Sequence, residues 1–213
     1  HEAETIVHLN SPDPDRRLRV GYVSPDFRDH SVAFYIASVL QTHDRSKFEV
    51  ACFSSVRRPD KTTAALKTLA DEWHDISQLG DLEAADLVRW RTVDILVDLA
   101  GHTADNRLDL FARRPAPVQV TYLGYPNTTG MRHMDYRLTD NVADPAESSD
   151  VWYTERLVRL PKTFLCYTPP TAAPPARAPP AGRPGAAGPR ARGTSRPAGA
   201  ADGAPACPSR GRP

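Results

Sequence analysis

The chain has 213 residues and a formal net charge of +1, and both its charges and its apolar residues are unevenly distributed. The last 46 residues contain seven Arg and one Asp but no Val, Ile, Leu, Met, Phe, Trp or Tyr, so the first part, of about 167 residues, must supply the core of a single domain. That first part carries a net charge of −5, which argues against nucleic acid as its main partner.

Apolar runs alternate with segments of helical spacing through the first part of the chain. Strands that alternate with helices form parallel sheets with right-handed crossovers, so the pattern predicts an α/β fold with a Rossmann-like sheet and helices on both faces. In chain order, we expect a strand at Leu18–Tyr22, a helix from Ser31, a strand at Phe48–Ser54, a helix at Lys61–Glu72, a strand at Trp73–Ile76, a helix between Leu82 and Trp90, a strand at Val93–Leu99, a helix at Leu108–Arg113, and strands at Val118–Leu123, Tyr136–Thr139 and Leu157–Leu160.

Three polar loops follow predicted strands, at Pro25–His30, Gly101–Asp105 and Gly124–Gly130. The carboxyl ends of parallel strands meet at one edge of a sheet, which is where open α/β sheets bind their ligands. We therefore expect the three loops to form one site.

His30 ends the first of these loops, directly before a predicted helix. An imidazole can accept a proton from a hydroxyl near pH 7, so His30 is a candidate general base or substrate-binding donor. The alternative is a surface histidine that caps the helix locally. The same choice between a functional and a local role applies to His102, which follows the strand VDILVDL.

Asp26 lies in the first of the three loops, and Asp98 lies near the end of the predicted strand Val93–Leu99. Asp26 can orient a histidine or bind a hydroxyl, or it can simply stabilise the turn. Asp98 alternates with core residues, so it is either a loop-facing polar group or a functional one. The loop GYPNTTG, residues 124–130, has glycine at both ends and can bring its backbone close to a sugar or phosphate; a plain turn is the alternative.

No GxGxxG or P-loop motif follows the first strand, so a dinucleotide cofactor or ATP bound in the usual way is not expected. No combination of His and Cys has metal-ligand spacing, and we predict no metal. Cys52 and Cys166 lie in apolar runs and are expected to be reduced thiols in the core. Neither a signal peptide nor a membrane-spanning apolar run is present, which predicts a soluble, cytoplasmic protein without a membrane partner.

Several longer segments together resemble the catalytic region of the O-linked N-acetylglucosamine transferase family, which includes the SPINDLY-type protein O-fucosyltransferases. The segments are LRVGYVSPDFRDHSV, FEVACFSS, DILVDLAGHTADNRLDLFARRPAPVQVTYLGYPNTTG, MDYRLTD and ERLVRLPKTFLCYTP, in that order. Members of this family have helical TPR repeats followed by a two-lobed GT-B catalytic unit. Residues 17–167 are similar to its N-terminal catalytic lobe, and residues 1–16 are then a linker.

The resemblance implies roles for the candidate residues. His30 matches the histidine of the family's DF-x-x-H motif, which is proposed as an active-site base. The GYPNTTG loop matches the segment that lines the cleft between the lobes, and Asp98 and His102 lie in a strand and loop that face the same cleft. The residues expected to bind substrate are Asp26, Asp98, His102, Tyr125, Pro126, Asn127 and Thr128.

The implied reaction transfers a sugar from a nucleotide diphosphate sugar to Ser or Thr hydroxyls of protein acceptors, with inversion of the anomeric centre and without a metal or other cofactor. UDP-GlcNAc is the expected donor. PNTTG and RLPKTFLCYTP look closer to the SPINDLY-type branch, so GDP-fucose is the competing donor. Outside enzymes, the alternative is a non-catalytic Rossmann-like binding module whose basic tail attaches to acidic partners.

Residues 168–213 depart from the family pattern, in which a second Rossmann-like lobe follows the first. A tail rich in Pro, Ala, Arg and Gly cannot bury a core and is expected to be disordered. The abrupt change of composition after Tyr167 suggests a frameshift or truncation, with a genuinely short protein as the alternative. Because one lobe encloses only half of the cleft, we expect the chain alone to bind donor weakly and to be inactive.

Overall fold

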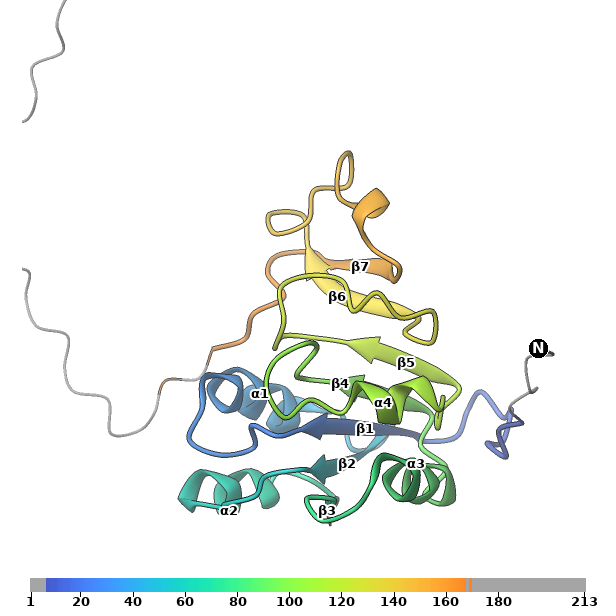
Figure 1. Cartoon of the computed structure of the whole chain (residues 1–213), viewed down its shortest axis with the longest axis vertical. Helices are drawn as coiled ribbons and strands as arrows, with labels where there is room; N and C mark the ends of the chain where they lie inside the picture. Colours follow the sequence, from blue (N-terminus) through green and yellow to red (C-terminus); the bar gives the residue numbers. More distant parts are fainter. Residues whose placement is uncertain (1–6, 168, 170–213) are drawn as a thin grey trace, which may run out of the picture. The chain divides into compact units, whose positions relative to one another are not determined.

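The computed structural model describes residues 7–167 and Pro169, which contain a seven-stranded sheet with the order β3-β2-β1-β4-β5-β6-β7 (Figure 1). Every neighbouring pair of strands is parallel, which confirms the α/β fold with a Rossmann-like sheet. The strands are β1 Leu18–Ser24, β2 Phe48–Ser54, β3 Glu72–Asp75, β4 Ile95–Asp98, β5 Val118–Thr121, β6 Tyr136–Asp140 and β7 Arg156–Leu160. The helices are α1 Ser31–Thr42, α2 Lys61–Lys67, α3 Asp81–Trp90, α4 Leu108–Ala112 and the 3-10 helix η1 Asp150–Trp152.

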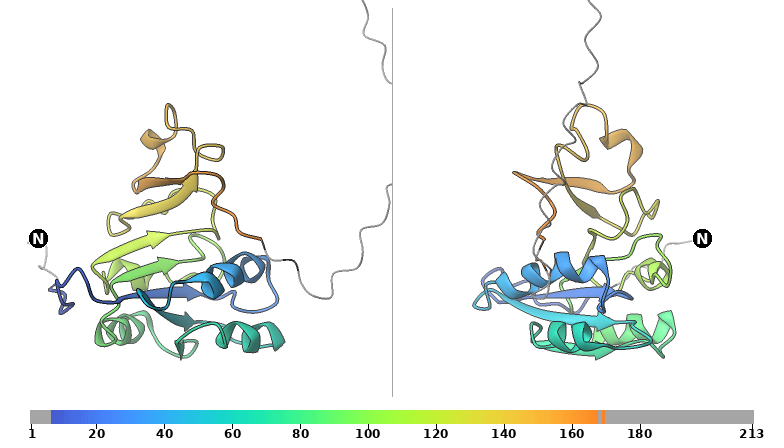
Figure 2. Two further views of the ribbon diagram at one scale, coloured as in Figure 1. Left: turned by 180° about the vertical axis from the view of Figure 1, so that it is seen from behind. Right: turned by 90° about the vertical axis from the view of Figure 1, so that its left-hand side faces the viewer.

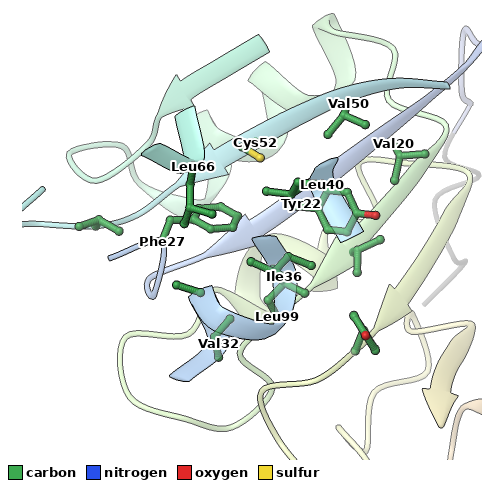
Figure 3. Close-up of a cluster of buried hydrophobic side chains, with 14 of the residues drawn as sticks. Val20, Tyr22, Phe27, Val32, Ile36, Leu40, Val50, Cys52, Leu66 and Leu99 are labelled. Carbon is green, nitrogen blue, oxygen red and sulfur yellow. The ribbon is translucent and has the colours of Figure 1, made fainter. Parts of the chain in front are cut away.

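Helices lie on both faces of the sheet around β1, β2 and β4 (Figure 2), where alternate strand residues enter two separate hydrophobic clusters. Tyr22 of β1 packs with α1 and α2, whereas its neighbour Val23 packs with α3 and α4. Figure 3 shows the first cluster, in which Ile36 and Leu40 of α1 lie among the strand side chains. The apolar runs of β1, β2 and β4 are therefore those of strands buried on both sides.

Helix α2 ends earlier than its spacing predicts, at Lys67 rather than Glu72. Glu72 instead begins β3, where it pairs with β2 and forms an ion pair with Arg91. Leu69 lies beyond the end of the helix but still packs against the first hydrophobic cluster, so the apolar spacing continues where the helix does not.

Residues 7–16, expected to be a linker, are attached to the sheet through Asp94. Arg16 donates two hydrogen bonds to the Asp94 carboxylate, at 2.6 and 2.7 Å, and Asn10 Nδ2 donates another at 2.6 Å. Burial opposes ionisation of Asp94, but these bonds hold its pKa below the ordinary value. The boundary at residue 16 stays a prediction, and the predicted tail at 168–213, apart from Pro169, lies outside the described residues.

The two cysteines expected in the core have different environments. Cys52 is a buried free thiol, and burial raises its pKa. Cys166 is also a free thiol but is exposed, so its expected core position is wrong. Its carbonyl accepts a hydrogen bond of 3.0 Å from Ser38 Oγ of α1, so the backbone contacts the helix although the residue is exposed. None of the helices in the described ranges is long and apolar enough to cross a membrane.

Candidate functional site

The sheet reverses its winding between β1 and β4. From β1 the chain passes outward to β2 and β3, and from β4 it passes in the opposite direction to β5, β6 and β7. Loops that follow two such strands diverge and leave a crevice at the carboxyl edge. A pocket of about 380 Å³ lies there, which is within the range of about 300–1,000 Å³ for small-molecule sites. Its lining includes Asp26, His30, Tyr35, Asp105, Leu123 and Gly124, so parts of all three predicted loops do meet.

His30 caps helix α1 at the edge of this pocket. Its Nδ1 accepts a hydrogen bond of 3.3 Å from the backbone N–H of Val32. One oxygen of the Asp26 carboxylate lies 3.7 Å from the same nitrogen. The His30 side chain is 37% exposed, so the ring is fixed on one side and open on the other.

These two neighbours suit different tautomers of His30. Accepting the Val32 N–H requires an unprotonated Nδ1 and leaves the proton on Nε2. Directing an Nδ1–H toward Asp26 instead leaves a lone pair on Nε2, which is the form able to accept a proton from a substrate. The observed contact is the capping one, and a general-base role for His30 stays a prediction that requires the other tautomer.

Two residues of the pocket wall have left-handed backbones although neither is glycine. Leu123 has φ 76° and Asp105 has φ 57°. This conformation costs about 1–2 kcal/mol for an ordinary residue, and it persists only where the surroundings impose it. Thr92 and Arg114, which lie outside the pocket lining, have left-handed backbones as well, so this conformation does not by itself mark the site.

Two glycines allow the loops after β4 and β5 to pack closely. A Cβ on Gly124 would overlap the backbone that follows β4, and a Cβ on Gly101, whose φ is 55°, would overlap the Cβ of Tyr125. The close approach places the Tyr125 ring edge-on to His102, with ring centroids 5.2 Å apart. His102 Nε2 donates a hydrogen bond of 2.8 Å to the carbonyl of Thr129. His102 is therefore held by the GYPNTTG loop, and its predicted position at the cleft between the lobes stays a prediction.

Asp98 lies inside the protein, with 1% of its surface exposed. Its carboxylate accepts hydrogen bonds from the N–H groups of Ala100, at 3.0 Å, and Gly101, at 2.8 Å, and from Thr121 Oγ1 at 3.0 Å. Burial raises its pKa above the ordinary value, although the hydrogen bonds oppose the shift. This placement does not support direct contact with substrate; Asp98 shapes the turn that carries His102.

A buried arginine holds the first part of the GYPNTTG loop. Arg137 of β6 is 2% exposed, and its Nη1 donates to the carbonyls of Tyr125, at 2.8 Å, and Asn127, at 3.2 Å. Its guanidinium also lies 5.5 Å from the centre of the Tyr153 ring. Since the loop contains no helix or strand of its own, these contacts supply the order that regular structure would otherwise give.

A buried carboxylate holds the second part of the same loop. Glu155 is 4% exposed and accepts hydrogen bonds from Thr128 Oγ1 and the Thr129 N–H, both at 2.7 Å, and from the Thr129 hydroxyl. Burial alone would raise the pKa of Glu155, but the hydrogen bonds from Thr129 and Thr128 outweigh it and keep the pKa below the ordinary value. The ionised form therefore stabilises the folded loop.

Replacing Glu155 with Gln is expected to lower the free energy of unfolding by about 2 kcal/mol, since hydrogen bonds to a charged group contribute about 1.5–3 kcal/mol. Because the folded-state pKa is depressed, this contribution is fully present above the unfolded value of 4.5 and disappears as the pH falls through the lower folded value. Urea unfolding at pH 7 and at pH 3 measures the difference. The exposed Glu147, changed to Gln, is the control, and equal effects of the two substitutions would contradict this role.

The structure separates the predicted site residues into groups. Asp26 and His30 line the pocket, and His102 and Tyr125 directly follow Gly101 and Gly124 and contact each other. Three further predicted site residues lie in the GYPNTTG loop and line a second hollow; they are Pro126, Asn127 and Thr128.

Sequence reasoning misses other residues of the site. Tyr35 and Thr103 line the pocket, and the signal for Tyr35 is its spacing of one helical turn from Ser31. Arg137 and Glu155 give no comparable signal, since only the folded chain brings them to the loop.

Comparison with known proteins supplies evidence that is separate from this geometry. The model of glycosyl transferase family 41 matches residues 1–168. The chain belongs to glycosyl transferase family 41. This family 41 chain is 45% identical over 168 residues to the probable UDP-N-acetylglucosamine–peptide N-acetylglucosaminyltransferase SPINDLY of Petunia hybrida. It is 38% identical over 163 residues to the UDP-N-acetylglucosamine–peptide N-acetylglucosaminyltransferase of Caenorhabditis elegans.

A similar solved structure is a point mutant of the O-GlcNAc transferase of Thermobaculum terrenum, with a TM-score of 0.75 and 50% sequence identity. That match covers 79% of the family 41 chain and 32% of the neighbour. The plant and nematode alignments cover 77% and 75% of this chain but only 18% and 14% of those proteins. The resemblance to the O-linked N-acetylglucosamine transferase family is confirmed, and the chain spans less than a third of its relatives.

Proposed function

We propose that this chain supplies one half of the active site of a protein O-glycosyltransferase, which transfers a sugar from a nucleotide diphosphate sugar to Ser or Thr hydroxyls with inversion. The observation that carries the proposal is the position of His30, in a pocket at the switch point of a family 41 sheet. UDP-GlcNAc is the proposed donor, because the plant and nematode relatives are named for it. GDP-fucose is the competing donor.

In the proposed reaction, the acceptor oxygen attacks the anomeric carbon while the bond from that carbon to the diphosphate oxygen breaks. The electron pair leaves with the diphosphate, and the hydroxyl proton passes to Nε2 of His30. The negative charge of Asp26, whose carboxylate lies 3.7 Å from Nδ1, stabilises the imidazolium that forms. Helix α1 has no acidic residue in its first turn, so its positive end favours negative charge that develops in the pocket.

The test is a hybrid enzyme in which residues 1–168 replace the matching segment of the Thermobaculum terrenum O-GlcNAc transferase. We expect the hybrid to transfer N-acetylglucosamine from UDP-GlcNAc to a serine-containing peptide, detected by mass spectrometry. A hybrid that folds and binds UDP but modifies no peptide would contradict the proposal. In a second hybrid, residues 1–168 replace the matching segment of the Petunia SPINDLY protein, and transfer is measured from GDP-fucose. The sugar is assigned by comparing the transfer rate of this hybrid with that of the first hybrid from UDP-GlcNAc.

A further inference from the structure

A second hollow, of about 510 Å³, lies next to the pocket along the loop that follows β5. Gly124 lines the pocket and Pro126 lines the hollow, so only Tyr125 separates them in the chain. Two residues of extended backbone span at most about 7 Å, so one short stretch of chain supplies lining residues to both the pocket and the hollow. The other wall of the hollow comes from the connection between β6 and β7 and includes Asp144, Ser149, Trp152 and Tyr153.

The lining of this hollow includes one large, exposed aromatic side chain. Trp152 is 73% exposed, and its neighbour Val151 is 82% exposed. Val142, in the same connection, is 87% exposed. A single exposed valine is ordinary, but an exposed indole beside a concave surface is typical of a residue that contributes strongly to binding a partner.

The hollow also offers hydrogen-bonding groups. In the described part of the chain, Asn127 Nδ2, Ser149 Oγ and Trp152 Nε1 have no protein partner, whereas Asn127 Oδ1 accepts the Thr128 N–H at 2.8 Å. These groups suit a ligand with carbonyl oxygens along its length. A polypeptide backbone has this chemistry, and its side chains can contact the indole.

The charges at the hollow balance each other. The Asp144 carboxylate accepts the Tyr153 hydroxyl at 2.6 Å and lies 3.7 Å from Nε of the buried Arg137. No lining residue in the described chain offers an unpaired positive charge. A nucleotide diphosphate would need such a charge or a helix N-terminus, so the hollow favours an uncharged ligand segment over the donor.

We propose that this hollow, which we call the Trp152 hollow, binds the acceptor polypeptide beside the Ser or Thr that is modified. The inference rests on the proposed function, because it assigns the acceptor side of the same site. A peptide whose hydroxyl reaches His30 continues along residues 123–128, and its flanking residues lie against Pro126 and Trp152.

The test compares Trp152→Ala with Trp90→Ala in the full chain. Trp90 is also 73% exposed but lies at the end of α3, so it is a matched control for loss of an exposed indole. The probe is a fluorescently labelled positional-scanning peptide library with one central serine and uncharged flanks. We expect Trp152→Ala to weaken peptide binding at least tenfold and Trp90→Ala to leave it unchanged, with melting temperatures and UDP-GlcNAc binding the same in both.

Equal peptide binding by the two variants would overturn the proposal. So would weaker UDP-GlcNAc binding in Trp152→Ala with unchanged peptide binding, which would assign the hollow to the donor. A wild-type dimer that becomes monomeric only in Trp152→Ala would assign it to self-association and equally overturn the proposal. Failure of the hybrid enzymes to modify any peptide contradicts the proposed function, and the peptide-binding measurement is separate from that result.

Discussion

Replacing His30 with Ala in the hybrid enzyme is expected to reduce sugar transfer by about 10²–10⁴-fold, which is the usual contribution of a positioned general base. The imidazole of His30 lines the pocket, and Asp26 lies near its Nδ1. In the tautomer with the proton on Nδ1, Nε2 has a lone pair that can accept the proton of the acceptor hydroxyl. Without it, the acceptor hydroxyl loses the imidazole that is proposed to receive its proton. The measurement is kcat for transfer to a serine peptide at saturating donor.

The same substitution also removes the cap of α1, so stability must be separated from catalysis. Loss of an N-cap hydrogen bond costs about 1 kcal/mol. His30→Asn provides the control, because Asn is a good N-cap but cannot act as a base near pH 7. We expect His30→Asn to keep the melting temperature and lose transfer. Transfer at the wild-type rate in this variant would show that His30 serves only as a cap.

Replacing Gly124 with Ala is expected to lower the free energy of unfolding by about 3 kcal/mol, near the upper end for an overpacked site. The new Cβ would overlap the carbonyl of Leu99, and backbone atoms cannot move aside as a flexible side chain can. A loss of this size lowers the melting temperature by about 6–12 °C in a chain of this length. Calorimetry measures it, and transfer in the hybrid is expected to fall as well because Gly124 lines the pocket.

The comparison variant is Gly130→Ala, at the other end of the same loop. Gly130 has φ 70° and no atom within 4 Å of a new Cβ, so the expected cost is about 1 kcal/mol from the left-handed backbone alone. If the two substitutions destabilise the protein equally, the close approach of the two loops is not the reason why position 124 requires glycine.

The composition and spacing of the sequence determined the architecture. Short apolar runs are typical of strands that are buried on both faces, and such runs separated by helical segments indicate a parallel sheet. Both patterns can be read from the sequence because each depends only on neighbouring residues. Parallel strands share a carboxyl edge, so the loops at Pro25–His30, Gly101–Asp105 and Gly124–Gly130 could be assigned to one site from order alone. The position of His30 before α1 follows from the same local pattern.

The tertiary structure decided what each polar residue does. Asp98 has the same local pattern as a loop-facing aspartate, but three donors enclose it. In the run that ends with Cys166, Phe164 packs against the first hydrophobic cluster whereas Cys166 is exposed. Glu155 contacts a loop 26 residues earlier in the chain. Such pairings depend on which strands become neighbours, and that is a property of the whole sheet rather than of any local segment.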